Sequence, residues 1–93
     1  MVLVRRPKTA DAAVARLVRG ARAMLAWSQT ELAERSGVAA RTLANIETGR
    51  RVPRDGTVER LAVAFAQAGI EMFESPDGFG LLLKISKDDG QVA

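Results

Sequence analysis

The chain has 93 residues, of which 47% are hydrophobic, and its net charge at neutral pH is +3. Its length predicts one domain, and because the only aromatic residues are Trp27, Phe65, Phe73 and Phe79, its core should be aliphatic, a composition that favours packed helices. The absence of cysteine and histidine excludes disulfides, thiolate and imidazole metal sites and most catalytic arrangements, so we expect no enzyme, cofactor or metal site. No apolar run has the length of a signal peptide or membrane span, which favours the cytoplasm.

Residues 1–9 are predicted to form a flexible arm that precedes the first helix. Its positive charge comes from Arg5, Arg6 and Lys8. The arm could follow the DNA, or it could serve only to keep the protein soluble. Thr9 or Asp11 can cap the helix that follows. Its apolar positions recur every three or four residues: Val14, Leu17, Val18, Ala21, Met24 and Leu25. Gly20 weakens this helix relative to alanine, which indicates a close helix contact there.

Two short helices are predicted next. Ser28 and Glu31 form a capping-box pattern, in which the hydroxyl accepts from a helix N–H and the carboxylate reaches back to the helix start. This helix ends at Gly37, where a left-handed conformation causes no Cβ clash. Its inward residues are Leu32 and Ala33. A third helix is predicted over residues 39–47, with an inward set of Val38, Leu43 and Ile46.

Turn residues and three arginines occupy positions 49–56, after which Thr57 can cap a fourth helix. The apolar stripe of this helix is Val58, Leu61, Ala62, Phe65 and Ala66. Beyond Gly69 the hydrophobic period changes to two, and a turn sequence at 75–78 separates two alternating segments. We therefore predict a β-hairpin over residues 70–86 and a disordered tail over residues 87–93.

The third predicted helix has an unusual outward face. With its apolar residues turned inward, the outward positions are Ala40, Arg41, Ala44 and Asn45. Alanine allows close approach, while Arg and Asn suit guanine and adenine edges in the major groove. Up to Arg54 the chain has eleven Lys/Arg against four Asp/Glu, but beyond it three against seven, which points to a polyanion partner for the first half. On charge alone, a solvated helix face would equally explain Arg16, Arg19 and Arg22.

The segment QTELAERSGVAARTLANIETG, residues 29–49, resembles the helix-turn-helix of phage repressors, Cro and the xenobiotic-response-element family of bacterial regulators. The residues in register are Gln29, Leu32, Ala33, Gly37, Val38, Leu43, Ile46, Glu47 and Gly49. The flanking helices extend the similarity to roughly residues 14–70. The resemblance implies a mainly α, lambda-repressor-like DNA-binding domain of four to five helices over residues 10–69, followed by the short C-terminal hairpin.

The resemblance also implies which residues meet DNA. Bases would be read by Ala40, Arg41, Ala44 and Asn45, although the family often has a longer polar side chain at position 40. The DNA backbone would be contacted by Ser28, Gln29, Ala39, Thr42, Arg50, Arg51 and Arg54. Glu47 would pair with Arg22 on the first helix, the alternative being an exposed pair of little energetic value.

The hairpin is the candidate dimerisation element. One helix-turn-helix contacts only a few base pairs, so a homodimer on a two-fold symmetric site is expected. The strands can pair across the two-fold axis, which would also cover an exposed apolar edge. The residues expected at this contact are Ile70, Met72, Phe73, Leu81, Leu82 and Leu83. The alternative is a hairpin that folds onto its own helices.

These features predict a sequence-specific, nucleoid-associated transcriptional regulator that binds double-stranded DNA as a homodimer. The alternative function is the antitoxin of a toxin–antitoxin module, which represses its own operon. RNA polymerase and a toxin are accordingly candidate protein partners. Gly78-Phe79-Gly80 is not a convincing phosphate loop, because it lacks a third glycine and a following helix.

Overall fold

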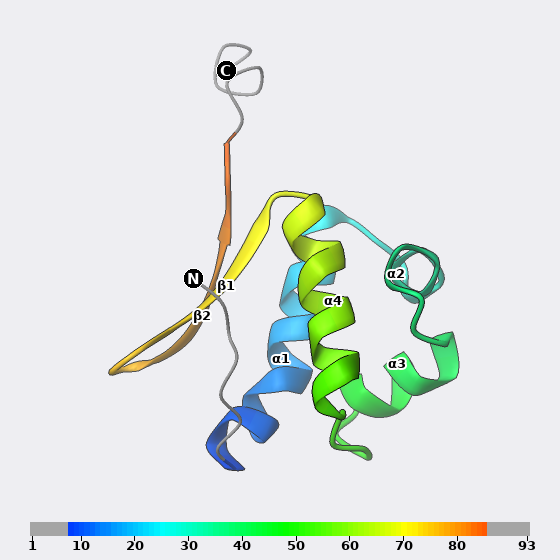
Figure 1. Cartoon of the computed structure of the whole chain (residues 1–93), viewed down its shortest axis with the longest axis horizontal. Coiled ribbons are helices and arrows are strands. Elements are labelled where there is room, and N and C mark those ends of the chain that lie inside the picture. Colours follow the sequence, from blue (N-terminus) through cyan, green and yellow to red (C-terminus); the bar gives the residue numbers. More distant parts are fainter. Residues whose placement is uncertain (1–7, 86–93) are drawn as a thin grey trace.

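The computed structural model describes residues 8–85, which form four helices and a hairpin (Figure 1). In chain order these elements are α1 (Lys8–Leu25), α2 (Gln29–Ser36), α3 (Ala40–Glu47), α4 (Asp55–Gln67), β1 (Ile70–Ser75) and β2 (Gly78–Leu83). The mainly helical fold with a C-terminal hairpin confirms the predicted class. None of the helices in this part of the chain is long and apolar enough to cross a membrane. Arg5, Arg6 and the expected tail over residues 87–93 lie outside the described residues.

Helix α1 begins at Lys8, earlier than expected. Thr9 and Asp11 therefore lie inside the helix instead of capping it, and Lys8 is helical rather than part of an arm. The sequence around them contains alanines at positions 10, 12 and 13, and alanine has the highest helix propensity of all residues. This local preference starts the helix at Lys8, roughly one and a half turns before Val14, the first position of α1 that the structure describes as buried.

A left-handed turn ends α1. Ala26 has φ 58°, a conformation that costs an L-residue roughly 1–2 kcal/mol. The N–H of Trp27 donates to the Arg22 carbonyl oxygen at 2.9 Å, and that of Ala26 donates to the Ala23 carbonyl oxygen at 3.1 Å. These are the two hydrogen bonds of a Schellman motif, which usually has glycine in the left-handed position.

Helix α4 begins at Asp55, so Thr57 lies in its first turn and is not its cap. The N-cap is Arg54, whose backbone is extended with φ −75° and ψ 160°. Its carbonyl oxygen accepts from the N–H of Val58 at 3.0 Å. The carboxylate of Asp55 lies at the positive end of the helix dipole, which favours this earlier start.

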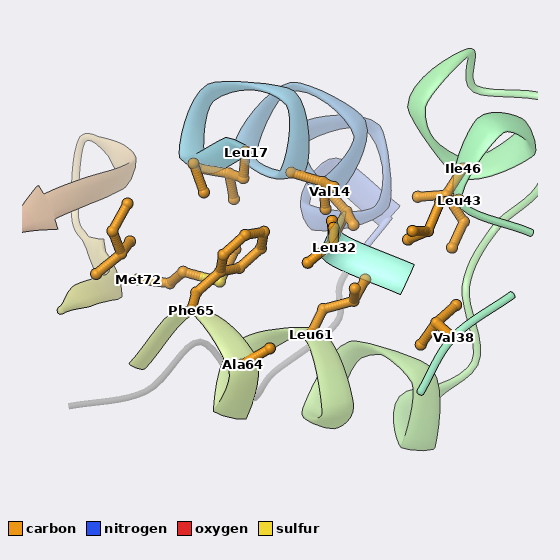
Figure 2. Close-up of a cluster of buried hydrophobic side chains, with 13 residues drawn as sticks. Val14, Leu17, Leu32, Val38, Leu43, Ile46, Leu61, Ala64, Phe65 and Met72 are labelled. Atoms are coloured by element: carbon orange, nitrogen blue, oxygen red, sulfur yellow. The ribbon is translucent and has the colours of Figure 1, made fainter. Parts of the chain in front are cut away.

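The hydrophobic core lies between the helices and the hairpin. Figure 2 shows Val14 and Leu17 of α1 facing Leu61 and Phe65 of α4. Its largest fully buried side chains are Phe65, Leu32, Leu43, Ile46, Leu61, Ile70 and Val18. Helix α1 packs against α3 and β2, while α4 packs against α2 and β1. The α2–α3 pair and the hairpin therefore lie on opposite sides of α1 and α4 (Figure 1).

The inner face of the hairpin folds onto the chain's own helices. The strands are antiparallel, with Met72 opposite Leu81. Ile70 and Met72 are only 1% and 7% exposed, so they support the hairpin from inside instead of facing a partner. A Cβ at Gly20 would lie 3.1 Å from Leu81 Cδ1, which shows that the close contact expected at Gly20 is with a strand and not with a helix.

The outer face of the hairpin is more open. Phe73 lies opposite Gly80, and its ring covers the space that a side chain at position 80 would need. Leu82 is on the same face and is 51% exposed. Leu83 lies opposite Ile70, on the inner side of the hairpin, but it is still 43% exposed, and Ile85, which follows β2, is 76% exposed. We use the name outer hairpin surface for the apolar residues of the hairpin and its end that stay outside the core cluster: Phe73, Leu82, Leu83 and Ile85.

Candidate DNA interface

Helix α2 has a defined cap at each end. The Ser28 hydroxyl oxygen accepts from the Glu31 N–H at 3.0 Å, which is one half of the expected capping box. The Glu31 carboxylate does not complete the box but accepts from Arg35 at 3.1 Å. At the other end Gly37 is left-handed, with φ 76°, and its N–H donates to the Ala33 carbonyl oxygen, as the sequence predicts.

The turn into α3 is held by one side chain. The Ser36 hydroxyl donates to the Leu32 carbonyl oxygen at 2.7 Å and accepts from the Val38 N–H at 3.1 Å. Val38 is buried, and Ala39 is the extended N-cap residue of α3. These contacts fix the angle at which α3 leaves the turn.

Helix α3 has a buried face and an open face. The buried face consists of Leu43, Ile46 and Glu47. The four positions expected to read bases lie together on the open face, where Ala40 and Arg41 are exposed and Ala44 and Asn45 are half-buried. Beside them, Ala39 is exposed and Thr42 is half-buried. The open face therefore combines short alanine side chains with one long basic side chain.

Behind the open face, the buried carboxylate of Glu47 accepts three side-chain hydrogen bonds. Arg22 donates Nε to Oε2 and Nη2 to Oε1, each at 2.9 Å, and Gln29 donates Nε2 to Oε1 at 3.1 Å. Arg22 also donates Nη1 to the Trp27 carbonyl oxygen at 2.9 Å. The network thus joins α1, the turn after it, the start of α2 and the end of α3.

The Arg22–Glu47 pair is buried enough to matter for the fold. The side chain of Glu47 is 3% exposed and that of Arg22 is 24% exposed, so this is not the exposed pair considered as the alternative. The side-chain hydrogen bond to Glu47 raises the pKa of Arg22 above its ordinary value, and the guanidinium stays charged at every physiological pH. Removing one partner of a buried pair costs about 3–5 kcal/mol, because the other charge is left uncompensated.

Ser28 and Gln29 lie at the N-terminus of α2, where a DNA phosphate is expected. Ser28 serves as the helix cap, and the amide nitrogen of Gln29 donates to Glu47. An amide nitrogen has two N–H groups, so Gln29 keeps one donor after the bond to Glu47 is made. The bond to Glu47 also restricts the orientation in which that donor is presented.

The loop after α3 carries three of the arginines expected on the DNA backbone. The N–H groups of Arg50 and Arg51 donate to the Asn45 carbonyl oxygen at 2.9 and 3.2 Å, which ties the loop to the end of α3. Arg50, Arg51 and Arg54 are exposed, while Pro53 is buried and anchors the loop. The loop therefore places exposed positive charge beside the open face of α3.

Arg19 and Arg35 make contacts at this site that were not predicted from the sequence. Arg19 donates Nη1 to the Glu47 carbonyl oxygen. Its spacing of three residues from Arg22 puts both on one face of α1, which is the signal that could have revealed it. The guanidinium of Arg35 lies 4.6 Å from the centroid of the Trp27 ring, a cation–π contact that no sequence spacing indicates.

A tight turn between two short helices, with an open basic face on the second, defines a helix-turn-helix DNA-binding domain. The family model described as helix-turn-helix matches residues 18–66, more than half of the chain. The chain belongs to this family, which comprises the Cro-like, phage-repressor-like and xenobiotic-response-element regulators, and it is a transcriptional regulator that binds double-stranded DNA. No curated protein matches the chain.

Proposed function

We propose that the protein binds a two-fold symmetric operator as a homodimer, with α3 of each protomer in the major groove, and acts in the cytoplasm on nucleoid DNA. The observation that carries this proposal is the open face of α3. Ala40 and Ala44 leave room for the DNA, while Arg41 and Asn45 belong to the residue types that recognise base edges. The buried network at Glu47 holds this face rigid, as base recognition requires.

Different residues recognise the bases and position the protein on the DNA. Arg41 is exposed, and its fork of donors matches O6 and N7 of guanine. The amide of Asn45 matches N6 and N7 of adenine. Contacts to phosphate, which depend on salt but not on base sequence, are assigned to Ser28, Gln29, Ala39, Thr42, Arg50, Arg51 and Arg54.

Selection from random DNA duplexes tests this assignment. The enriched duplex and a scrambled duplex of equal length are then titrated with three variants over a range of salt concentrations. Arg41→Ala should lower affinity for the enriched duplex by about 10- to 100-fold and leave the scrambled duplex almost unaffected. Arg51→Ala should weaken both and reduce the salt slope by about one. Arg60→Ala removes an exposed arginine of α4 that has no assigned DNA contact, and it is the matched control.

Two results would contradict the proposal. If selection enriches no sequence, the protein is not sequence-specific. If Arg41→Ala weakens both duplexes equally, Arg41 contacts phosphate and does not read a base.

The homodimer is assigned to the outer hairpin surface. Leu82 and Leu83, on opposite faces at the end of β2, are 51% and 43% exposed, and Ile85, just beyond the strand, is 76% exposed. A small monomer rarely leaves neighbouring apolar side chains so open. A second copy of the chain, related by a two-fold axis, would cover this surface and give the complex the symmetry of its operator.

A further inference from the structure

The last turn of α3 depends on a residue from another helix. A helix leaves its final four carbonyl groups without partners inside the helix. In α3 the carbonyl oxygens of Ala44, Asn45 and Ile46 accept from backbone N–H groups of the following loop, at 2.9 to 3.2 Å. The fourth, that of Glu47, accepts from the guanidinium of Arg19 on α1. Within residues 8–85, it is the one among these four carbonyls that is tied to a distant part of the chain.

Arg19 and Arg22 hold the same residue in different ways. They are three residues apart and lie on one face of α1. Arg22 binds the Glu47 carboxylate, which is attached to its backbone through rotatable side-chain bonds. Arg19 binds the Glu47 carbonyl, which is part of the backbone of α3 itself. The second contact therefore restricts the helix in a way that the ion pair alone does not.

The restricted helix is the one that carries the base-reading residues. Helix α3 has eight residues, about two turns, so its direction depends on how its ends are held. Asn45 is two residues and Arg41 six residues from the clamp at Glu47. Bidentate contacts to a base tolerate little misplacement, because both donors must meet their acceptors together.

We propose that Arg19 is a positioning residue for base recognition, which fixes the C-terminal end of α3 through the Glu47 carbonyl. The proposal rests on the function proposed above, because it assumes that Arg41 and Asn45 read bases. Arg19 is exposed, so its side chain contributes little apolar burial to the core. Its removal should consequently loosen α3 without unfolding the domain.

Hydrogen exchange of the DNA-free protein provides the first test. The amides of Gly49, Arg50 and Arg51 report on the end of α3, since each donates to one of its last carbonyls. Arg19→Ala should speed their exchange about fivefold or more, while the slowest core amides stay near wild type. Arg16→Ala removes an exposed arginine one turn earlier on α1 and should change neither set. Unchanged exchange at the end of α3 in Arg19→Ala would overturn the proposal.

DNA binding provides the second test, with the enriched and scrambled duplexes described above. Arg19→Ala should lose about tenfold in affinity for the enriched duplex and less than twofold for the scrambled one. Arg19→Lys keeps the charge, but its ammonium ends one bond short of the position of Nη1, the atom that donates to the Glu47 carbonyl, so it should lose specific affinity in the same way. Full activity of Arg19→Lys, or equal loss on both duplexes, would show that Arg19 supplies only charge to the DNA and would overturn the proposal. If no duplex is enriched at all, the proposed function fails, but the exchange experiment still decides the role of Arg19.

Discussion

The carboxylate of Glu47 accepts from Arg22 and Gln29 in a part of the molecule from which water is almost excluded. Arg22→Met should therefore lower the free energy of unfolding by about 3 kcal/mol or more, since it leaves a buried carboxylate without its cation. Urea unfolding measures this loss. Circular dichroism reports the helices, and Trp27, the single tryptophan, reports the turn whose carbonyl Arg22 binds.

The matching double variant separates charge from packing. Arg22→Met with Glu47→Leu removes both charges together and should recover at least half of the stability lost by Arg22→Met alone. A loss of less than about 1 kcal/mol in Arg22→Met would mean that the pair behaves as an exposed one.

Ala26 offers a stabilising substitution. It is an alanine in a left-handed conformation, φ 58°, at the position where a Schellman motif normally has glycine. Ala26→Gly relieves that strain but adds freedom to the unfolded chain, so we expect a net gain of about 0.5–1 kcal/mol. Ala23→Gly, three residues earlier in the exposed interior of α1, should instead cost about 1 kcal/mol. Thermal unfolding of the two variants should therefore shift in opposite directions.

At the scale of helices and strands, hydrophobic period predicted most of the fold. The spacing of Leu32, Leu43 and Ile46 correctly indicated which faces of α2 and α3 turn inward. The predicted starts of α1 and α4 were wrong. A capping residue such as Thr57 competes with the helix propensity and the charges of its neighbours, and the sequence does not show which of these prevails. Alternation in the hairpin indicated strands, but not which face would meet α1, because apolar residues occur on both.

The contact between α1 and β2 can be tested at Gly20. A Cβ there would lie 3.1 Å from Leu81 Cδ1, so Gly20→Val should push the hairpin away from α1 and cost about 1–3 kcal/mol. Combining it with Leu81→Ala restores room and should cost less than the sum of the two single variants. Gly56→Ala serves as the control, because no atom lies within 4 Å of a Cβ at that position of α4 and the change should stabilise by up to about 1 kcal/mol. Strict additivity of Gly20→Val and Leu81→Ala in urea unfolding would show that the two sites do not touch.

At the scale of the whole molecule, two surfaces lie on opposite sides of α1 and α4: the proposed DNA interface at α2–α3 and the outer hairpin surface (Figure 1). Because of this separation, one copy of the chain can contact DNA through one surface and a second copy of the chain through the other. It also means that deleting the hairpin is a poor test of dimerisation. Ile70 and Met72 belong to the core, so their removal would damage the fold along with any interface.

A single charge on the outer hairpin surface is a cleaner test. Leu82 is 51% exposed and faces away from the core, so Leu82→Lys should leave the helical signal and unfolding midpoint of the protomer almost unchanged. A lysine buried between two copies would be desolvated without a partner, and the variant should sediment as a monomer at concentrations where the wild type is a dimer. Val63→Lys places the same charge at a similarly exposed apolar residue of α4 and should remain dimeric.

The monomeric Leu82→Lys variant should still bind a single half-site but lose the steep binding curve of the full operator, because joint occupation of two half-sites multiplies affinity. If Leu82→Lys stays dimeric while Val63→Lys becomes a monomer, the two-fold axis passes beside α4 and the outer hairpin surface is not the interface.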